Sequence, residues 1–111
     1  MGDGLYRVEI PSSITLDASK TIANVNDPVT CTATLTRPDT HAPLANKPVT
    51  IYHTLNGERY NDAVNKLTDS AGKFVVNMPS TPPGARYYYA SFDGDATYGK
   101  TTSAWVMVYI G

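Results

Sequence analysis

Residues Arg86 to Tyr98 read RYYYASFDGDATY, and this stretch decides how the rest of the chain is interpreted. It follows Pro82-Pro83-Gly84, a combination that cannot continue a strand. Tyr87 to Phe92 is short, apolar and rich in aromatic residues, which favours a β-strand. Asp93-Gly94-Asp95 then ends the run with a turn dipeptide. We therefore expect an aromatic strand near the centre of a sheet.

Other strands are predicted outward from this one, and the clearest is Val29 to Thr36, where apolar residues alternate strictly with threonine. Such alternation places one face on a core and the other in water. Weaker versions recur at Ile14–Leu16, Val49–Leu55, Glu58–Asn65, Lys73–Met78 and Ser103–Ile110. Lys20–Pro28 is interpreted mostly as a connection, and Leu5–Ile10 as either an edge strand or linker. With no apolar period of 3.6 long enough for a helix, the pattern predicts an all-β, antiparallel two-sheet sandwich of about seven strands.

The length and the charge of the chain argue against several classes of function. A chain of 111 residues is the size of one domain, which we expect to span 13–111 after a flexible N-terminal or linking segment, 1–12. The net charge of -1 argues against a nucleic-acid partner, because phosphate binding needs a basic patch. No apolar run is long enough for membrane insertion. Met1–Gly4 lacks a signal-peptide pattern and is interpreted as an engineered start on an excised fragment.

The residues capable of catalysis do not form a recognisable set. The chain has two histidines, His41 and His53, and no nucleophile elbow or HExxH-type metal motif. His53 could be combined with Asp62 or Asp69 and a serine into a triad, but such combinations occur by chance in most chains. We therefore expect no enzyme activity and no cofactor.

Four segments, in order, resemble the bacterial Ig-like repeats of large surface and adhesion proteins in bacteria and archaea. They are PLANKPV at Pro43–Val49, TDSAGKF at Thr68–Phe74, YASFDGDATY at Tyr89–Tyr98 and TSAWV at Thr102–Val106. The resemblance covers roughly Ser13 to Ile110 and implies an Ig-like sandwich. It also implies an extracellular or cell-surface location, and neighbouring domains of the parent chain as partners. Another surface protein or a glycan is the alternative partner.

The same resemblance suggests a role for Cys31, the single cysteine. It lies where disulfide-bonded Ig domains carry one cysteine, with Ala90 opposite and Tyr88 at the position of a tyrosine corner. With no second cysteine, Cys31 is most simply a small buried hydrophobe. An internal lysine–asparagine cross-link, known among surface Ig-like modules, is disfavoured, and only Lys73 and Asn77 keep it open.

Asp93 and Asp95 are weak candidates for a calcium site, since they offer two carboxylates in one turn. The alternative is that one of them caps its own turn by accepting backbone N–H groups. Without a DxDxDG-type loop, and given the resemblance, the capping interpretation is favoured and no metal is expected.

The most informative functional feature is aromatic. Six side chains have outward parity on strands that share one sheet in an Ig-like sandwich: Tyr52, Tyr87, Tyr89, Trp105, Met107 and Tyr109. They could stabilise the sheet by cross-strand pairing, or be covered by an N-terminal strand or a neighbouring domain. They could also form a contact surface for a protein or for sugar rings. We expect a structural or adhesive module that acts as a spacer or protein-interaction repeat. The alternative is a carbohydrate-binding module that uses Trp105, Tyr87 and Tyr89.

Overall fold

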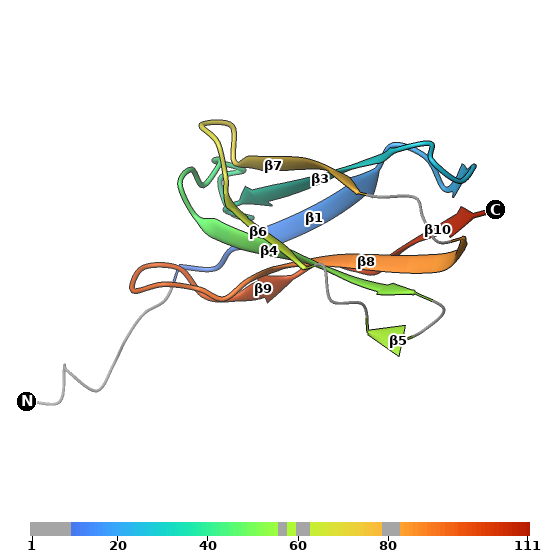
Figure 1. Cartoon of the computed structure of the whole chain (residues 1–111). Helices are drawn as coiled ribbons and strands as arrows, with labels where there is room; N and C mark the ends of the chain where they lie inside the picture. Colours follow the sequence, from blue (N-terminus) through green and yellow to red (C-terminus); the bar gives the residue numbers. More distant parts are fainter. Residues whose placement is uncertain (1–9, 56–57, 60–62, 79–82) are drawn as a thin grey trace, which may run out of the picture.

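Two β-sheets face each other across one apolar core (Figure 1). The computed structural model describes residues 10–55, 58–59, 63–78 and 83–111. Within these ranges the chain forms ten strands and no helix. The strands are β1 (Ser13–Ala18), β2 (Ile22–Ala23), β3 (Val29–Thr36), β4 (Pro48–Leu55), β5 (Glu58–Arg59), β6 (Val64–Leu67), β7 (Lys73–Met78), β8 (Gly84–Phe92), β9 (Thr101–Thr102) and β10 (Val106–Ile110).

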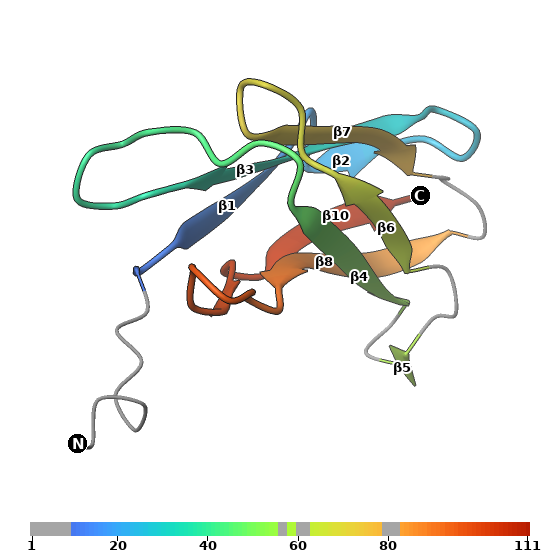
Figure 2. The same cartoon turned by 90° about the vertical axis from the view of Figure 1, so that its left-hand side faces the viewer.

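The smaller sheet has the order β1-β3-β7, and the larger one β2-β10-β8-β4-β5, with β6 also paired to β4 and β9 to β8. Figure 2 shows the two layers, with β1, β3 and β7 over β4, β8 and β10. All pairings between these strands are antiparallel except that of β2 with β10. The predicted sandwich is confirmed, and the aromatic strand β8 lies inside the larger sheet, between β10 and β4.

The core follows the alternation of the sequence. On β3 the apolar positions are fully buried and the threonines are only half-buried, as the pleat requires. Across the core lie the inward residues of β4, β8 and β10: Val49, Ile51, Tyr88, Ala90, Phe92, Val108 and Ile110. Each large side chain buried in this way contributes about 1.5–3 kcal/mol to stability. Because every second residue of these strands is buried, the register of the strands is fixed, and the residues in between form the outer faces.

The connection predicted at Lys20–Pro28 contains a short strand, β2, at the point where the chain passes from the smaller sheet to the larger one. After β1 pairs with β3, the chain crosses over and β2 pairs with β10 in parallel. Tyr109 N–H donates to Thr21 O at 2.9 Å, and Gly111 N–H donates to Ala23 O at 3.0 Å. The rest of Lys20–Pro28 is a connection, as predicted, and β2 was missed because a two-residue strand has no measurable period.

Two predicted strands are interrupted. Glu58–Asn65 is two strands, β5 and β6, which pair with different parts of β4. Ser103–Ile110 begins as a strand only at Val106, and the additional strand β9 lies before it. The break follows from Ser103, whose hydroxyl accepts the Ala90 N–H at 2.8 Å in place of a backbone carbonyl.

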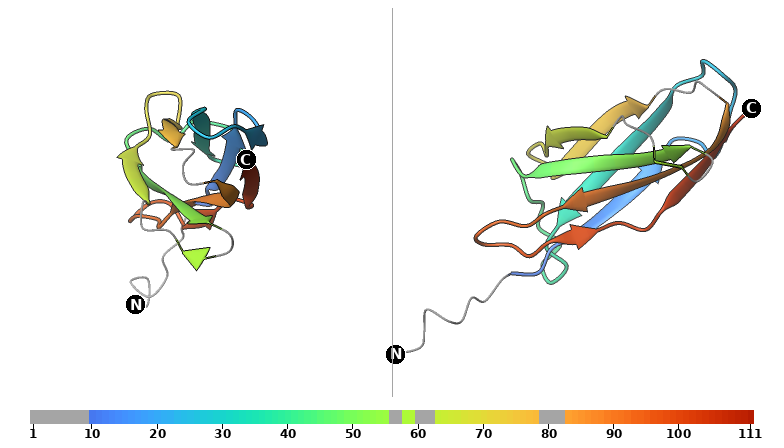
Figure 3. Two further views of the ribbon diagram at one scale, coloured as in Figure 1. Left: turned by 45° about the vertical axis from the view of Figure 1, so that its right-hand side comes forward. Right: turned by 60° about the horizontal axis from the view of Figure 1, so that its bottom comes forward.

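The described chain enters and leaves the sandwich at opposite ends (Figure 3). At the entry, Ile10 N–H donates to Thr97 O at 2.9 Å, and Gly99 N–H donates to Ile10 O at 3.0 Å. The edge strand considered at Leu5–Ile10 lies outside the described residues except for Ile10, which forms an isolated bridge with Tyr98. The division into residues 1–12 and 13–111 stays a prediction.

Candidate functional site

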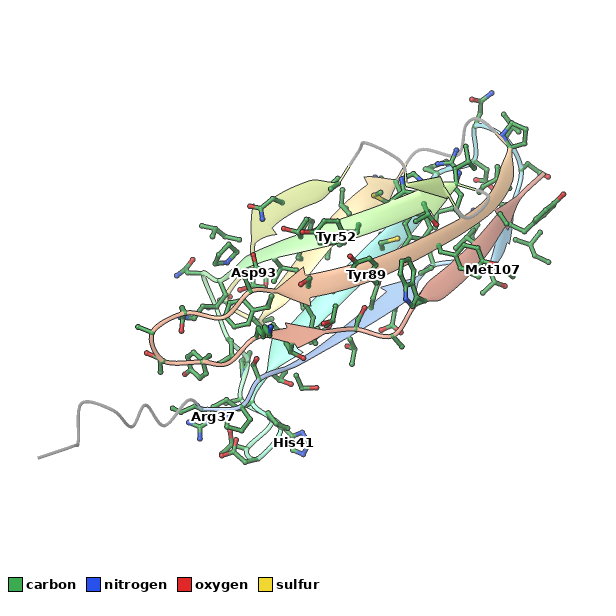
Figure 4. The ribbon with its side chains drawn as sticks, turned by 90° about the horizontal axis from the view of Figure 1, so that it is seen from below. Arg37, His41, Tyr52, Tyr89, Asp93 and Met107 are labelled. Atoms are coloured by element: carbon green, nitrogen blue, oxygen red, sulfur yellow. The ribbon has the colours of Figure 1, made fainter. Side chains whose placement is uncertain are left out.

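The predicted outward aromatic side chains lie together on the larger sheet. Tyr52 on β4 is directly opposite Tyr89 on β8, and their rings stack with centroids 4.9 Å apart and planes 17° apart. Trp105, just before β10, lies 4.4 Å from Tyr89 and makes an edge contact with Tyr87 at 6.4 Å. Figure 4 shows Tyr52, Tyr89 and Met107 following one another across β4, β8 and β10. We call the six predicted residues the aromatic face.

The rings of this face are turned toward one another. Because β8 lies between β4 and β10, Tyr52 and Trp105 flank Tyr89 from its two sides. Tyr52, Tyr87 and Tyr89 are only half-buried, and Trp105 is 55% exposed. Stacked rings stabilise the sheet, but they leave less ring surface for a flat ligand such as a sugar. Trp105 is therefore the ring of this row that is most open to solvent.

The exposed apolar surface extends one strand further than the sequence indicated. Met107 and Tyr109 alternate outward along β10 and are about half exposed. Tyr109 is paired in register with Ile22 of β2, which is 75% exposed. Ile22 was missed because β2 was not expected, and its parity relative to Tyr109 depends on a pairing between distant parts of the chain.

Charge is unevenly distributed over the two outer faces. The outward positions of β2, β4, β8, β9 and β10, all within the described part of the chain, carry no charged side chain. The outer face of the smaller sheet carries four threonines from β3, together with Asp17 of β1 and Lys73 of β7. The part of the larger sheet made by these five strands is uncharged and partly aromatic, which favours contact with another uncharged surface, whereas β6 of the same sheet carries exposed Lys66.

The carboxylate of Asp95 is engaged within its own loop. Its Oδ1 accepts the N–H groups of Thr97 and Tyr98, both at 2.8 Å, and its Oδ2 accepts Lys47 Nζ at 2.6 Å. The Lys47 hydrogen bond and these backbone N–H groups lower the pKa of Asp95 from 3.8 to about 2. Gly94 has φ +87°, which glycine adopts without strain. This is the capping arrangement, and no cluster of three or more His, Cys, Asp or Glu occurs among the described residues.

The two histidines lie apart in the fold. His41 is exposed in the loop at the entry end of the sandwich, near Arg37 (Figure 4). His53 is buried on β4, where its ring stacks on Tyr88 at 4.9 Å and its Nε2 lies 3.0 Å from Arg86 Nη1. Because a guanidinium only donates, this Nε2 accepts, so it does not carry the proton.

A triad around His53 finds little support in this geometry. Asp69, one of the acids considered for it, accepts the N–H groups of Ala71 and Lys73 within its own turn. Those two hydrogen bonds lower the pKa of Asp69. The other acid, Asp62, lies outside the described residues. Arg86 is fully buried and was missed by the sequence reasoning. Arg86 has the same inward parity as Tyr88, so the pattern would have predicted its burial only if the predicted strand had begun one residue earlier.

Cys31 is fully buried on β3, and burial raises the pKa of its thiol to about 11. The thiol therefore stays protonated at neutral pH, which suits a small core residue and not a nucleophile. Lys73 and Asn77, considered for a cross-link, are both exposed on β7. Asn77 instead accepts the Thr30 hydroxyl at 2.7 Å on the outer face.

With this geometry established, comparison with known proteins identifies the family. The bacterial Ig-like domain (group 3) family matches residues 15–111. The chain belongs to this family. Among solved structures, it is similar to the D0-D1 domain of intimin, with a TM-score of 0.62 and 28% sequence identity. That match covers 88% of this chain and 48% of the intimin chain, so this chain spans about half of its length.

A second similar structure is the CARDB domain of a Pyrococcus furiosus protein in complex with di-metal ions. It has a TM-score of 0.50 and 12% identity, covers 89% of this chain and 91% of that one, and supports the fold alone. No curated protein matches. Ig-like domains of this kind are typical of bacterial surface and adhesion proteins, and they are generally non-enzymatic structural modules. In the described residues there is no helix long and apolar enough to cross a membrane.

Proposed function

We propose that this chain is a non-enzymatic structural and adhesive module of an extracellular surface protein. It acts as a spacer or as a protein-interaction repeat, with residues 13–111 as the module and neighbouring domains as its first partners. The observation that carries the proposal is that the described chain begins at one end of the sandwich, beside the loop at Tyr98, and leaves it at the other (Figure 3). Modules of this shape can be joined in series, so that each one adds its length to a rod.

The way in which both ends are attached supports a spacer. Ile10 is held by backbone hydrogen bonds to the loop at Thr97 and Gly99, and Gly111 is held by one to Ala23. Within the described residues, both ends of the chain are therefore attached to the sandwich by backbone hydrogen bonds. The Asp95–Lys47 ion pair further stabilises the entry loop, because Asp95 also caps the N–H groups of Thr97 and Tyr98.

A carbohydrate-binding module is the second candidate, and one observation favours it. Trp105 is 55% exposed, next to the half-buried rings of Tyr87 and Tyr89. Sugar rings bind to exposed aromatic faces. The stacking of Tyr52 on Tyr89 weighs against this candidate, because those two rings cover each other.

An NMR titration of the single module separates the two candidates. The ligands are neutral soluble glycans and calcium, and the reporters are the Trp105 indole and the amides of Asp93 and Asp95. We expect no saturable shift with either. A saturable shift at Trp105, Tyr87 and Tyr89 with a glycan would replace the spacer by a carbohydrate-binding module. A shift at Asp93 and Asp95 with calcium would assign a metal site to that turn.

A further inference from the structure

The aromatic face does not end at Trp105 but continues to the end of the sandwich where the chain leaves. Exposed Ile22 and Tyr109 are paired there, and Val25, also exposed, follows in the loop after β2; we call these three residues the exit patch. Ile22 is paired with Tyr109, and Val25 follows Ala23, the residue that holds Gly111. A Cβ built on Gly111 would lie 2.6 Å from the Tyr109 ring, so that ring lies directly beside the departing chain.

We propose that the exit patch is the seat of a second Ig-like module of this family, joined in series after Gly111. The inference rests on the proposed spacer function and adds where its neighbour binds. The proposed occupant is tethered, because a module joined after Gly111 would begin beside Tyr109, which is paired with Ile22. The similar intimin chain, of which this chain covers 48%, is long enough to hold a further domain beside the matching one.

The size of the surface argues for a tethered partner over a free one. The aromatic face and Ile22 lie on four strands of the larger sheet. Strands about 4.8 Å apart and on average about six residues long, at about 3.3 Å per residue, give this surface an area of roughly 400 Å². A stable complex between free proteins buries about 800 Å² on each partner. The face is thus too small to hold a separate copy tightly. A short linker, however, raises the local concentration of the neighbour to about the millimolar range, where a weak contact is populated.

The chemistry around the patch fits the same occupant. The outward positions of the adjoining described strands carry no charge, so a charged partner such as an acidic peptide would find no counter-charge there. Lys20 and Asp27, which flank β2 in the sequence, form an ion pair at 2.9 Å and neutralise each other. An apolar centre with a polar rim is the usual composition of a protein–protein contact.

The test uses a chain with two copies of this module in series, compared by NMR with a single copy. The matched control is a single copy extended after Gly111 by residues 1–12 alone, which has the linkage without the second module. We expect the amides of Ile22, Val25 and Tyr109 in the first copy to shift only when the whole second module is present. Relaxation should then show the two modules tumbling together.

Two variants of the first copy make the result specific. Ile22→Asp places a charge in the patch and should abolish these shifts and the joint tumbling. Val75→Asp places the same charge at an exposed apolar position of β7, on the other sheet, and should leave both unchanged. A dispersed spectrum of each single-copy variant shows that it folds, and Val25→Asp replaces Ile22→Asp if that variant does not.

Three outcomes would overturn the proposal: no shift beyond that of the extended control, equal effects of the two charges, or independent tumbling of the two modules. The glycan titration of the single module is independent of all three. Sugar binding at Trp105 would therefore refute the spacer function without changing the two-copy result.

Discussion

The two outer faces of the sandwich are built by the same alternation and yet differ in chemistry. The face of the smaller sheet is made of Thr30, Thr32, Thr34 and Thr36, with charged neighbours on β1 and β7. The face of the larger sheet carries stacked tyrosines, Trp105 and Met107, and its described strands β2, β4, β8, β9 and β10 carry no outward charge. Threonine hydroxyls are satisfied by water, whereas exposed aromatic surface is not.

This difference in chemistry is the basis on which we propose a contact surface. Fold stability does not require an uncharged outer face, since the smaller sheet packs on the same core with a polar one. We therefore propose that the aromatic face has a role in addition to the fold, and that this role is a contact at the exit patch at its end.

The largest expected effect is on the free energy of unfolding, and it tests whether buried side chains of the two sheets contribute equally to the core. Phe74 of β7 and Phe92 of β8 are both buried, one beneath each face. Phe74→Ala and Phe92→Ala should each lower the free energy of unfolding by about 3–5 kcal/mol. Denaturant unfolding measures both. A loss for Phe74→Ala of less than a third of that for Phe92→Ala would mean that the smaller sheet only covers the core loosely.

The next largest effect is the loss of stability when alanine replaces a glycine in a turn next to each sheet. Gly72 precedes β7 with φ +73°, and an added Cβ would lie 2.5 Å from Leu35 O, a backbone atom. Gly94 follows β8 with φ +87°, and its nearest such contact is 3.0 Å. Positive φ costs about 1–3 kcal/mol for other residues, so Gly94→Ala should fall in that range and Gly72→Ala at or above its upper end. Equal thermal-unfolding losses would show that the Leu35 contact relaxes freely.

A smaller effect compares the centres of the two faces directly. Tyr89→Ala removes ring contacts with Tyr52 and Trp105, and should cost about 1–2 kcal/mol from two cross-strand pairs. Thr32→Ala, at an outward position of β3, should cost less than about 1 kcal/mol. Both are measured by urea unfolding. If Tyr89→Ala is as mild as Thr32→Ala, the stacking contributes little and the rings are free to serve a ligand.

The smallest effect concerns the entry loop and depends on pH. Because the folded pKa of Asp95 is lowered to about 2, its contribution to stability is complete above about pH 4 and is lost as the pH falls toward 2. Asp95→Asn should therefore lower stability slightly at pH 7 and flatten the decline between pH 4 and 2. Unfolding curves across this range measure it, with Asp17→Asn on the outer face of β1 as the control. Matching acid profiles for the two variants would contradict a special role for the Asp95 cap.

Much of this fold could be predicted from the sequence, because the pleat of a strand ties parity to burial. The alternation of Val29–Thr36 and the outward parity of Tyr87 and Tyr89 follow from that rule alone. Turn chemistry likewise indicated the capping role found for Asp95. The short strands β2 and β9 could not be predicted, because two residues show no period and their pairing depends on distant segments.

The candidate site was predictable as a set of residues but not as a geometry. Parity places Tyr52 and Tyr89 on one face, yet it does not indicate that their rings stack on each other instead of facing solvent. Ile22 lies beside Tyr109, at the end of the aromatic face, only because β2 joins β10 in the larger sheet. The burial of Arg86 could not be predicted, because arginine is usually exposed. Its contact with His53 depends on the register of β4 against β8.

The central claim, that the aromatic face meets a neighbouring module at its exit end, is tested most directly by solvent accessibility. A paramagnetic cosolute added to the single-copy and two-copy chains reports on the methyl groups of Ile22 and Val75, which lie on opposite sheets. We predict that joining a second module protects Ile22 of the first copy from the cosolute and leaves Val75 as accessible as before. Equal relaxation of Ile22 in the two chains would contradict the account.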